Sequence, residues 1–134
     1  MRRAAKVDRE SPIQIAIVDY LRLQYPDWII HHAKGEINKG GLAFMREQAK
    51  ANRKGAVKGF PDLVVLPLSH IGAIFFEVKA VGNYATPDQK ALHARMEALG
   101  YRVAVVRSID DVQERLAAWG IGGTVKIPLR GQIT

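Results

Sequence analysis

The sequence contains no cysteine, no long apolar run and comparatively few acidic residues. Without cysteine, the chain can form neither disulfides nor thiolate metal sites, and this composition is compatible with a reducing cytosol. No apolar stretch approaches the roughly 20 residues of a membrane-spanning helix. The N-terminal residues lead into charged positions 8–10 instead of the apolar core of a signal peptide. We therefore expect a soluble cytoplasmic protein with no membrane partner, found in the cytoplasm of the host cell if its origin is viral.

The shortage of acidic residues leaves an excess of positive charge. Twenty Lys and Arg against thirteen Asp and Glu give a net charge of +7, a balance that suits a nucleic-acid partner. Residues 34–58 account for +5 of this total, and residues 42–53 are expected to form a helix with a basic face. This segment is either an ordinary solvated face or a surface that contacts DNA phosphates. Its candidate nucleic-acid-binding residues are Lys34, Lys39, Arg46, Lys50, Arg53, Lys54 and Lys58.

Two apolar runs in the middle of the chain carry charged residues at their ends. Asp62 opens the run 63–66, while Glu77 and Lys79 close the run 73–78. Both runs are typical of strands, and the short polar connection between them predicts an antiparallel pair that brings Asp62 near Glu77. Side chains two apart in a strand share a face, so Glu77 and Lys79 point to the same side. We expect two acids and one lysine to converge.

Burying these charges without partners would cost several kcal/mol per ion, even after relaxation. A divalent cation would offset that cost, because Asp62 and Glu77 offer oxygen ligands and the Val78 carbonyl lies between two of the candidates. Mg2+ takes only one or two carboxylates and keeps several waters. Lys79 could then address a phosphate. The alternative is a solvent-facing ion pair of Glu77 with Lys79, which would contribute little.

Two predicted helix starts share a capping pattern, Ser-Pro-Ile-Gln at residues 11–14 and Thr-Pro-Asp-Gln at residues 86–89. The first predicts Ser11 as N-cap with Gln14 closing the capping box, and the second is equivalent. Glu10 precedes the first helix, where a carboxylate suits the helix dipole. Gln89 has either a capping role alone or a reach toward the acid cluster.

Residues 28–33 are expected to form a short strand with two adjacent histidines. His31 and His32 fall on opposite faces of a regular strand, so they cannot both face one metal site. One of the two is expected to pack or to contact phosphate, and the residues alone favour neither.

Together these patterns predict an α/β fold in which one domain, formed by all 134 residues, has a central mixed β-sheet flanked by helices. Residues 102–107 form a buried strand entered from a helix, which favours parallel pairing through a βαβ crossover. A last helix is expected over residues 109–119. Residues 1–9 are expected to be flexible. Residues 121–134 form a C-terminal extension that either adds an edge strand at 124–127 or contacts a partner chain.

The order of these motifs resembles the PD-(D/E)xK nuclease superfamily, and within it the chain is most similar to the VRR-NUC (virus-type replication-repair nuclease) family. The resemblance implies a restriction-endonuclease-like core and a metal-dependent phosphodiesterase that acts on DNA. It runs from about Glu10 to Leu116. It rests on Glu10-Ser-Pro-Ile-Gln14, His32 with Gly35-Glu36, Gly59-Phe-Pro-Asp62, Glu77-Val-Lys79, Thr86-Pro-Asp-Gln89 and Gly100-Tyr-Arg-Val-Ala-Val-Val-Arg-Ser108.

By position, the resemblance implies a role for each residue of the site. Asp62, Glu77 and the Val78 carbonyl would hold Mg2+ or Mn2+, joined by Glu10 directly or through water. Lys79 would orient the attacking water or neutralise the phosphate, and Gln89 would support it. The family often has Asn-Glu where this chain has Gly35-Glu36, which leaves Glu36 as a possible additional acid.

Small members of this family resemble structure-specific endonucleases that act as homodimers on branched DNA such as four-way (Holliday) junctions. The resemblance therefore implies a DNA endonuclease, a homodimer and a branched substrate. One alternative is a catalytically silent DNA-binding module of the same fold. Another is a restriction-type duplex nuclease, although the sequence has no evident second domain for sequence recognition.

Overall fold

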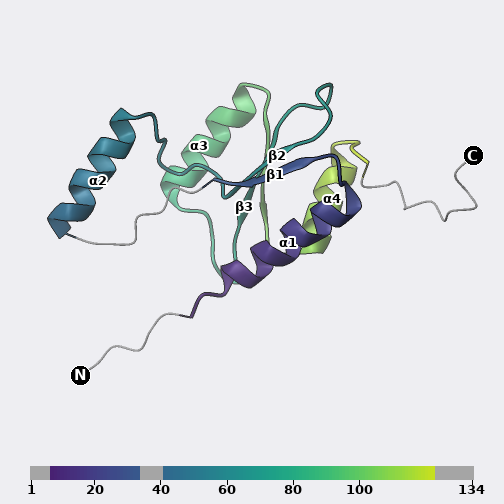
Figure 1. The fold of residues 1–134 in the computed structure, drawn as a ribbon, viewed down its shortest axis with the longest axis horizontal. Helices are drawn as coiled ribbons and strands as arrows, with labels where there is room; N and C mark the ends of the chain where they lie inside the picture. The colour runs from purple at the N-terminus through teal and green to yellow at the C-terminus, as the bar shows by residue number, and fades with distance from the viewer. Residues whose placement is uncertain (1–6, 34–40, 123–134) are drawn as a thin grey trace, which may run out of the picture.

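The computed structural model describes residues 7–33 and 41–122 (Figure 1). It contains four helices and four strands in the described part of the chain, and none of these helices is long and apolar enough to cross a membrane. The elements, in order, are α1 Glu10–Gln24, β1 Ile29–His32, α2 Gly41–Arg53, β2 Leu63–Leu66, β3 Ile74–Val78, α3 Pro87–Ala98, β4 Arg102–Val106 and α4 Ile109–Ala118.

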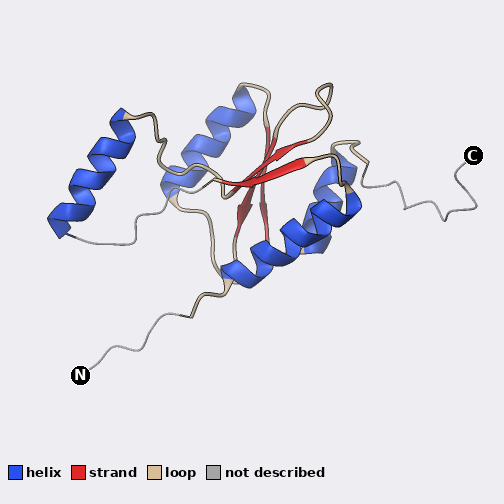
Figure 2. Cartoon of the chain, in the orientation of Figure 1, coloured by secondary structure: helices blue, strands red, loops and turns tan. Residues whose placement is uncertain are grey.

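The four strands form one mixed sheet in the order β1-β2-β3-β4 (Figure 2). β2 is antiparallel to both β1 and β3, whereas β4 is parallel to β3 and follows it through α3. This arrangement confirms the predicted α/β class, the antiparallel central pair and the βαβ crossover. Because β3 and β4 are parallel, their carboxyl ends, Val78 and Val106, pair at one edge of the sheet.

The two faces of β3 enter different layers of the core. Phe76 and Val78 belong to the larger apolar cluster, with Ile17 of α1 and Leu116 of α4. Phe75 packs on the other face, in a smaller cluster that α3 and β4 share. Figure 1 shows α1 and α4 side by side, with α3 across the sheet from them. Strand alternation then places Glu77 on the α3 face, in a strand with no exposed residue.

The start of α1 differs from the prediction. The helix begins at Glu10, and Ser11 is not its N-cap. Instead, Oδ1 of Asp8 accepts hydrogen bonds from the backbone N–H groups of Glu10 (3.1 Å) and Ser11 (3.0 Å). A carboxylate is a stronger acceptor than a hydroxyl, so the Asp8 side chain satisfies these N–H groups and the helix starts two residues earlier, with Arg9 at the N-cap position.

Gln14 therefore closes no capping box. Its amide nitrogen lies 2.8 Å from Nδ1 of His32, which ties α1 to the edge strand β1. His32 thus has a contact within the fold, although the side chains of both His31 and His32 are exposed. Glu36 and the possible edge strand at 124–127 lie outside the described residues.

Candidate active site

The carboxylate of Asp62 is fixed between two strands. The residue directly precedes β2, and its backbone carbonyl accepts a 2.8 Å hydrogen bond from the N–H of Ala33, just beyond β1. Its side-chain Oδ2 accepts a 2.8 Å bond from the N–H of Val78 at the end of β3. Antiparallel pairing of β2 and β3 thus brings Asp62 to Glu77, as the sequence predicted.

Glu77 is buried on the α3 face, with only 2% of its surface exposed. Burial, followed by the charge and the hydrogen bond of Asp62, raises the pKa of Glu77 to about 8, although Lys79 counteracts part of the rise. In the metal-free protein at neutral pH, Glu77 therefore holds a proton next to Asp62. A carboxyl group that keeps its proton beside a second carboxyl group marks a place where a bound cation would replace that proton.

Lys79 is also buried, and its Nζ lies 3.6 Å from Oε2 of Glu77. Its backbone N–H donates to the carbonyl of Val106 (3.0 Å), which continues the β3–β4 pairing beyond the strand. The alternative of a solvent-facing ion pair is therefore wrong, because both side chains are enclosed. An enclosed ammonium group interacts more strongly with a nearby anion than one in water does.

Gln89 combines the two roles that the sequence left open. At the start of α3, Thr86 Oγ1 accepts from the Gln89 N–H (3.2 Å) and Gln89 Oε1 accepts from the Thr86 N–H (2.8 Å), which confirms the second capping box. The remaining side-chain nitrogen of Gln89 donates to Oε2 of Glu77 at 3.1 Å. The cap holds the amide in place, so its N–H is aimed at the acid.

Glu10 lies at the border of this cluster. Its Oε2 accepts 3.3 Å hydrogen bonds from the N–H of Ala80 and from Nδ2 of Asn83. Glu10 therefore contacts the residue that follows Lys79, in addition to standing in the first turn of α1. Within residues 7–33 and 41–122, no three His, Asp or Glu side chains are grouped closely enough to hold a metal.

The carboxylate pair by itself fits a hard divalent cation. Oε1 of Glu77 is buried and has no hydrogen-bond partner among the described residues. Such an atom is costly unless something satisfies it. Asp62 offers a second oxygen beside it, since only one of its two oxygens receives the Val78 N–H. Two carboxylates with the rest of the coordination shell left to water are what Mg2+ prefers.

Sequence reasoning missed two polar residues around the site. Asn83 connects Glu10 to the loop after β3, and no pattern in the sequence identifies it. His93 is buried one turn after Gln89 on the same face of α3, and its Nε2 has no partner in the described part of the chain. Burial lowers the pKa of His93, which keeps the imidazole neutral. Its four-residue spacing from Gln89 could have identified it, because residues four apart on a helix lie on the same face.

The loop before Asp62 is packed directly on the start of α3. Gly59 has φ +85°, and a Cβ at this position would lie 2.8 Å from the backbone carbonyl oxygen of Asp88. Gly72 shares the same φ, but a Cβ there would have no atom within 4 Å. The loop that carries Asp62 and the helix start that carries Gln89 therefore keep their spacing only because residue 59 has no side chain.

We expect Gly59→Ala to lower both the melting temperature and the catalytic activity. Gly72→Ala is the matched control, since both variants carry the same backbone strain of roughly 1–2 kcal/mol and only Gly59→Ala pushes α3 away from the site. Thermal unfolding, and an assay of the DNA cleavage that the sequence resemblance implies, measure the difference between the two variants. Equal losses of stability and activity in the two variants would contradict this account.

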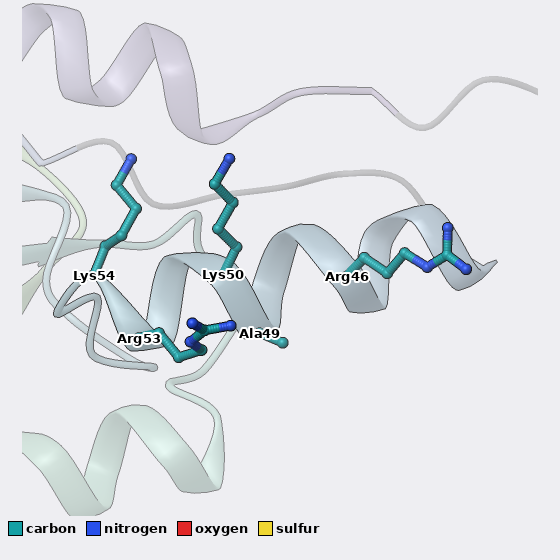
Figure 3. A pocket seen from close by; sticks show the side chains of 5 residues that line it. All are labelled: Arg46, Ala49, Lys50, Arg53 and Lys54. Atoms are coloured by element: carbon teal, nitrogen blue, oxygen red, sulfur yellow. The ribbon is translucent and has the colours of Figure 1, made fainter.

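The basic helix α2 has its charged side chains in solvent. Leu42 and Met45 are also more than 60% exposed, so these two apolar side chains of α2 lie in solvent as well. Figure 3 shows Lys50 and Lys54 extending in the same direction from the helix. A shallow hollow of ≈ 570 Å³ is lined by Arg46, Ala49, Lys50, Arg53 and Lys54.

The other predicted phosphate contacts are distributed differently. Lys58 makes an exposed ion pair with Asp88 at 3.1 Å, next to the start of α3. Lys34 and Lys39 lie outside the described residues. A role in DNA binding stays a prediction for all seven basic residues.

The chain is similar to known proteins over most of its length. A family model described as "VRR-NUC domain" matches residues 7–110. A protein of Acyrthosiphon pisum secondary endosymbiont phage 1, named "Putative nuclease p44", is 41% identical over 92 residues, or 67% of this chain and 90% of that protein.

Two solved structures share the fold. A "VRR_NUC domain protein" has a TM-score of 0.61 at 24% identity, over 86% of this chain and 90% of that one. A "VRR_NUC domain" structure has a TM-score of 0.58 at 20% identity, over 84% and 97% of the respective chains.

Proposed function

Because this chain belongs to the VRR-NUC domain family and is therefore a nuclease, we propose that it is a Mg2+- or Mn2+-dependent DNA endonuclease. The observation that carries this proposal is the pair of half-buried Asp62 and buried Glu77, with Oε1 of Glu77 lacking a partner among the described residues and the ammonium group of Lys79 beside it. A fold has no structural need for a buried carboxyl group next to a second one, since their mutual repulsion raises the pKa of one of them.

Asp62, Glu77 and the Val78 carbonyl would hold the metal ion, with Glu10 joining them directly or through water. When bound, the ion would polarise the phosphoryl oxygen and lower the pKa of its water. Lys79 is close enough to Glu77 to place its positive charge against the scissile phosphate. Gln89 holds Oε2 of Glu77, which fixes the orientation of that carboxylate before any substrate arrives.

DNA would approach over the exposed basic residues of α2. Arg46, Lys50, Arg53 and Lys54 are exposed around one hollow, and phosphate contacts of basic side chains supply most of the non-specific affinity for DNA. The loop from α2 to Asp62 connects this surface to the site. We assign to α2 the positioning of the duplex, and to the carboxylate pair the chemistry.

We further propose that the substrate is branched, with a four-way junction as the leading candidate, and that the active species is a homodimer. A two-fold dimer presents two equivalent active sites, which matches a junction that needs two symmetric cuts. The sequence resemblance supports this choice over the restriction-type alternative. A catalytically silent DNA-binding module is disfavoured, because DNA binding alone does not require Asp62 and the buried Glu77 to lie side by side.

The experiment that tests the proposal incubates the purified chain with a four-way junction, a linear duplex, single strands and a supercoiled plasmid. Each is tested with Mg2+, Mn2+ or EDTA. We expect cutting with either metal and none with EDTA, and faster cutting of the junction than of the duplex. Light scattering on the same sample measures the oligomeric state. If the chain binds DNA but cleaves no substrate with either metal, the proposal that it is an endonuclease is wrong. Sequence-specific cutting of the duplex would favour the restriction-type alternative.

A further inference from the structure

A second polar cluster lies beside the carboxylate pair, in the loop that follows β3. The guanidinium of Arg107 sits over the ring of Tyr84, 5.4 Å from its centroid, and donates a 2.8 Å hydrogen bond to the backbone carbonyl of Asn83. The side chain of Asn83 accepts from Arg9 at 3.3 Å. Three segments far apart in the sequence thus meet: the start of α1, the loop 80–86 and the residue after β4.

Tyr84 is held in place but uncovered. The side chain is 74% exposed even though Arg107 lies over one face of its ring. The opposite face is therefore open to solvent. The ring is also anchored, because Arg107 is fixed by the Asn83 carbonyl and the loop is closed by a 3.0 Å bond from the Asn83 N–H to the Ala80 carbonyl. An exposed aromatic ring that is held rigid loses little conformational entropy on binding.

This cluster is directly connected to the active site. Asn83 donates from its amide to Glu10, and Glu10 also accepts from the N–H of Ala80, the residue after Lys79. One turn of chain therefore separates the buried ammonium group from the exposed ring. A base stacked on Tyr84 would lie five residues along the chain from Lys79.

We propose that Tyr84, with Arg107 and Arg9, forms a stacking platform for an unpaired or unstacked nucleobase next to the scissile phosphate. This inference rests on the proposed function, and it names the substrate class more narrowly: DNA in which one strand leaves the duplex at the cleavage position. Rings of Tyr bind bases through their faces without regard to sequence, and arginines nearby hold the backbone. A guanidinium has five donors, so one bond to Asn83 leaves Arg107 able to contact phosphate.

The platform separates two tasks on two surfaces. α2 presents Arg46, Lys50, Arg53 and Lys54 around a shallow hollow, which suits the phosphate backbone of a paired duplex. The loop 80–86 presents the Tyr84 ring under Arg107, beside Asn83, which accepts from Arg9, and this arrangement suits a strand whose bases are free to stack. DNA bound at both surfaces would be paired on α2 and unpaired at Tyr84.

Binding measured in EDTA tests the platform independently of catalysis. The full chain is titrated with a duplex and with the same duplex carrying a single-stranded flap, with 2-aminopurine at the first unpaired position. We expect the wild type to bind the flap more tightly and to change the 2-aminopurine fluorescence. Tyr84→Ala should weaken flap binding roughly 5- to 100-fold and leave duplex binding unchanged. Tyr84→Phe should retain both signals.

Two controls separate stacking from folding. Tyr101 is 49% exposed at the opposite end of β4, so Tyr101→Ala removes a comparable ring away from the site. Tyr84→Leu keeps most of the bulk and loses the π face, and thermal melts of all variants report the fold. The inference is overturned if Tyr84→Ala and Tyr84→Leu bind the flap like the wild type, or if they lose duplex and flap binding equally. If the wild type cuts no DNA but binds the flap more tightly than the duplex in EDTA, the proposed nuclease function is wrong and the stacking platform is still supported.

Discussion

Asp62→Asn should abolish metal-dependent DNA cleavage and leave the fold intact. The substitution removes one of the two carboxylates that meet at the end of β3 in the described part of the chain. The asparagine can still accept the Val78 N–H through its Oδ1, so the β2–β3 connection is kept, and its amide can donate to the partnerless Oε1 of Glu77. Stabilisation of transition-state charge by a metal is worth several kcal/mol. We expect a rate loss on the order of 10³-fold or more.

A matched control makes this result specific. Asp19→Asn removes the same charge from an exposed position on α1, more than two turns beyond Glu10, and it should cut DNA at the wild-type rate. Single-turnover assays in saturating Mg2+ and in Mn2+ measure the rates, and calorimetric titration measures metal binding. Cleavage by Asp62→Asn within about tenfold of the wild-type rate would remove Asp62 from the metal site.

The part of the site that the sequence predicted is the part that short-range geometry determines. Strand alternation places Glu77 and Lys79 on one face, and the short connection 67–73 between β2 and β3 favours an antiparallel pair that brings Asp62 to them. The capping box around Thr86 is equally local, because it depends on residues three apart. Each of these predictions needed only a period or a spacing, and the structure confirms all three geometries.

Other features depend on competition or on tertiary contacts, which spacing does not encode. Ser11 lost the N-cap position because Asp8, a better acceptor, lies within reach of the same N–H groups. Asn83 and Arg107 meet only after β3, the loop and β4 have folded together. The burial of Lys79 likewise depends on α3 covering the sheet, so a bare acid-x-lysine pattern could not tell an enclosed pair from a surface pair.

Glu77→Gln should stabilise the metal-free protein, increasingly so as the pH rises. In the folded chain the pKa of Glu77 is raised from 4.5 to about 8, while in the unfolded chain it returns to its ordinary value. Below pH 4.5 both states hold this proton, and Glu77 costs the folded wild type nothing. Between pH 4.5 and about 8 the unfolded state loses the proton that the folded state keeps, so the free energy of unfolding falls as pH rises through this window. Glutamine has no proton to lose. We expect its melting temperature in EDTA to exceed that of the wild type by several °C at pH 8 and to match it near pH 4.5.

Metal should reverse this order. A cation that binds the carboxylate pair stabilises the folded wild type by mass action, and its binding displaces the proton from Glu77. Melts at pH 8 with added Mg2+ or Mn2+ should therefore raise the wild-type melting temperature and leave that of Glu77→Gln unchanged, while cleavage by the variant is lost. Glu114→Gln, an exposed change on α4, should follow the wild type in every condition. If Glu77→Gln is no more stable than the wild type in EDTA at pH 8, the pKa of Glu77 is not raised in the folded protein. The assignment of Asp62 and Glu77 as the metal site would then lose its main support.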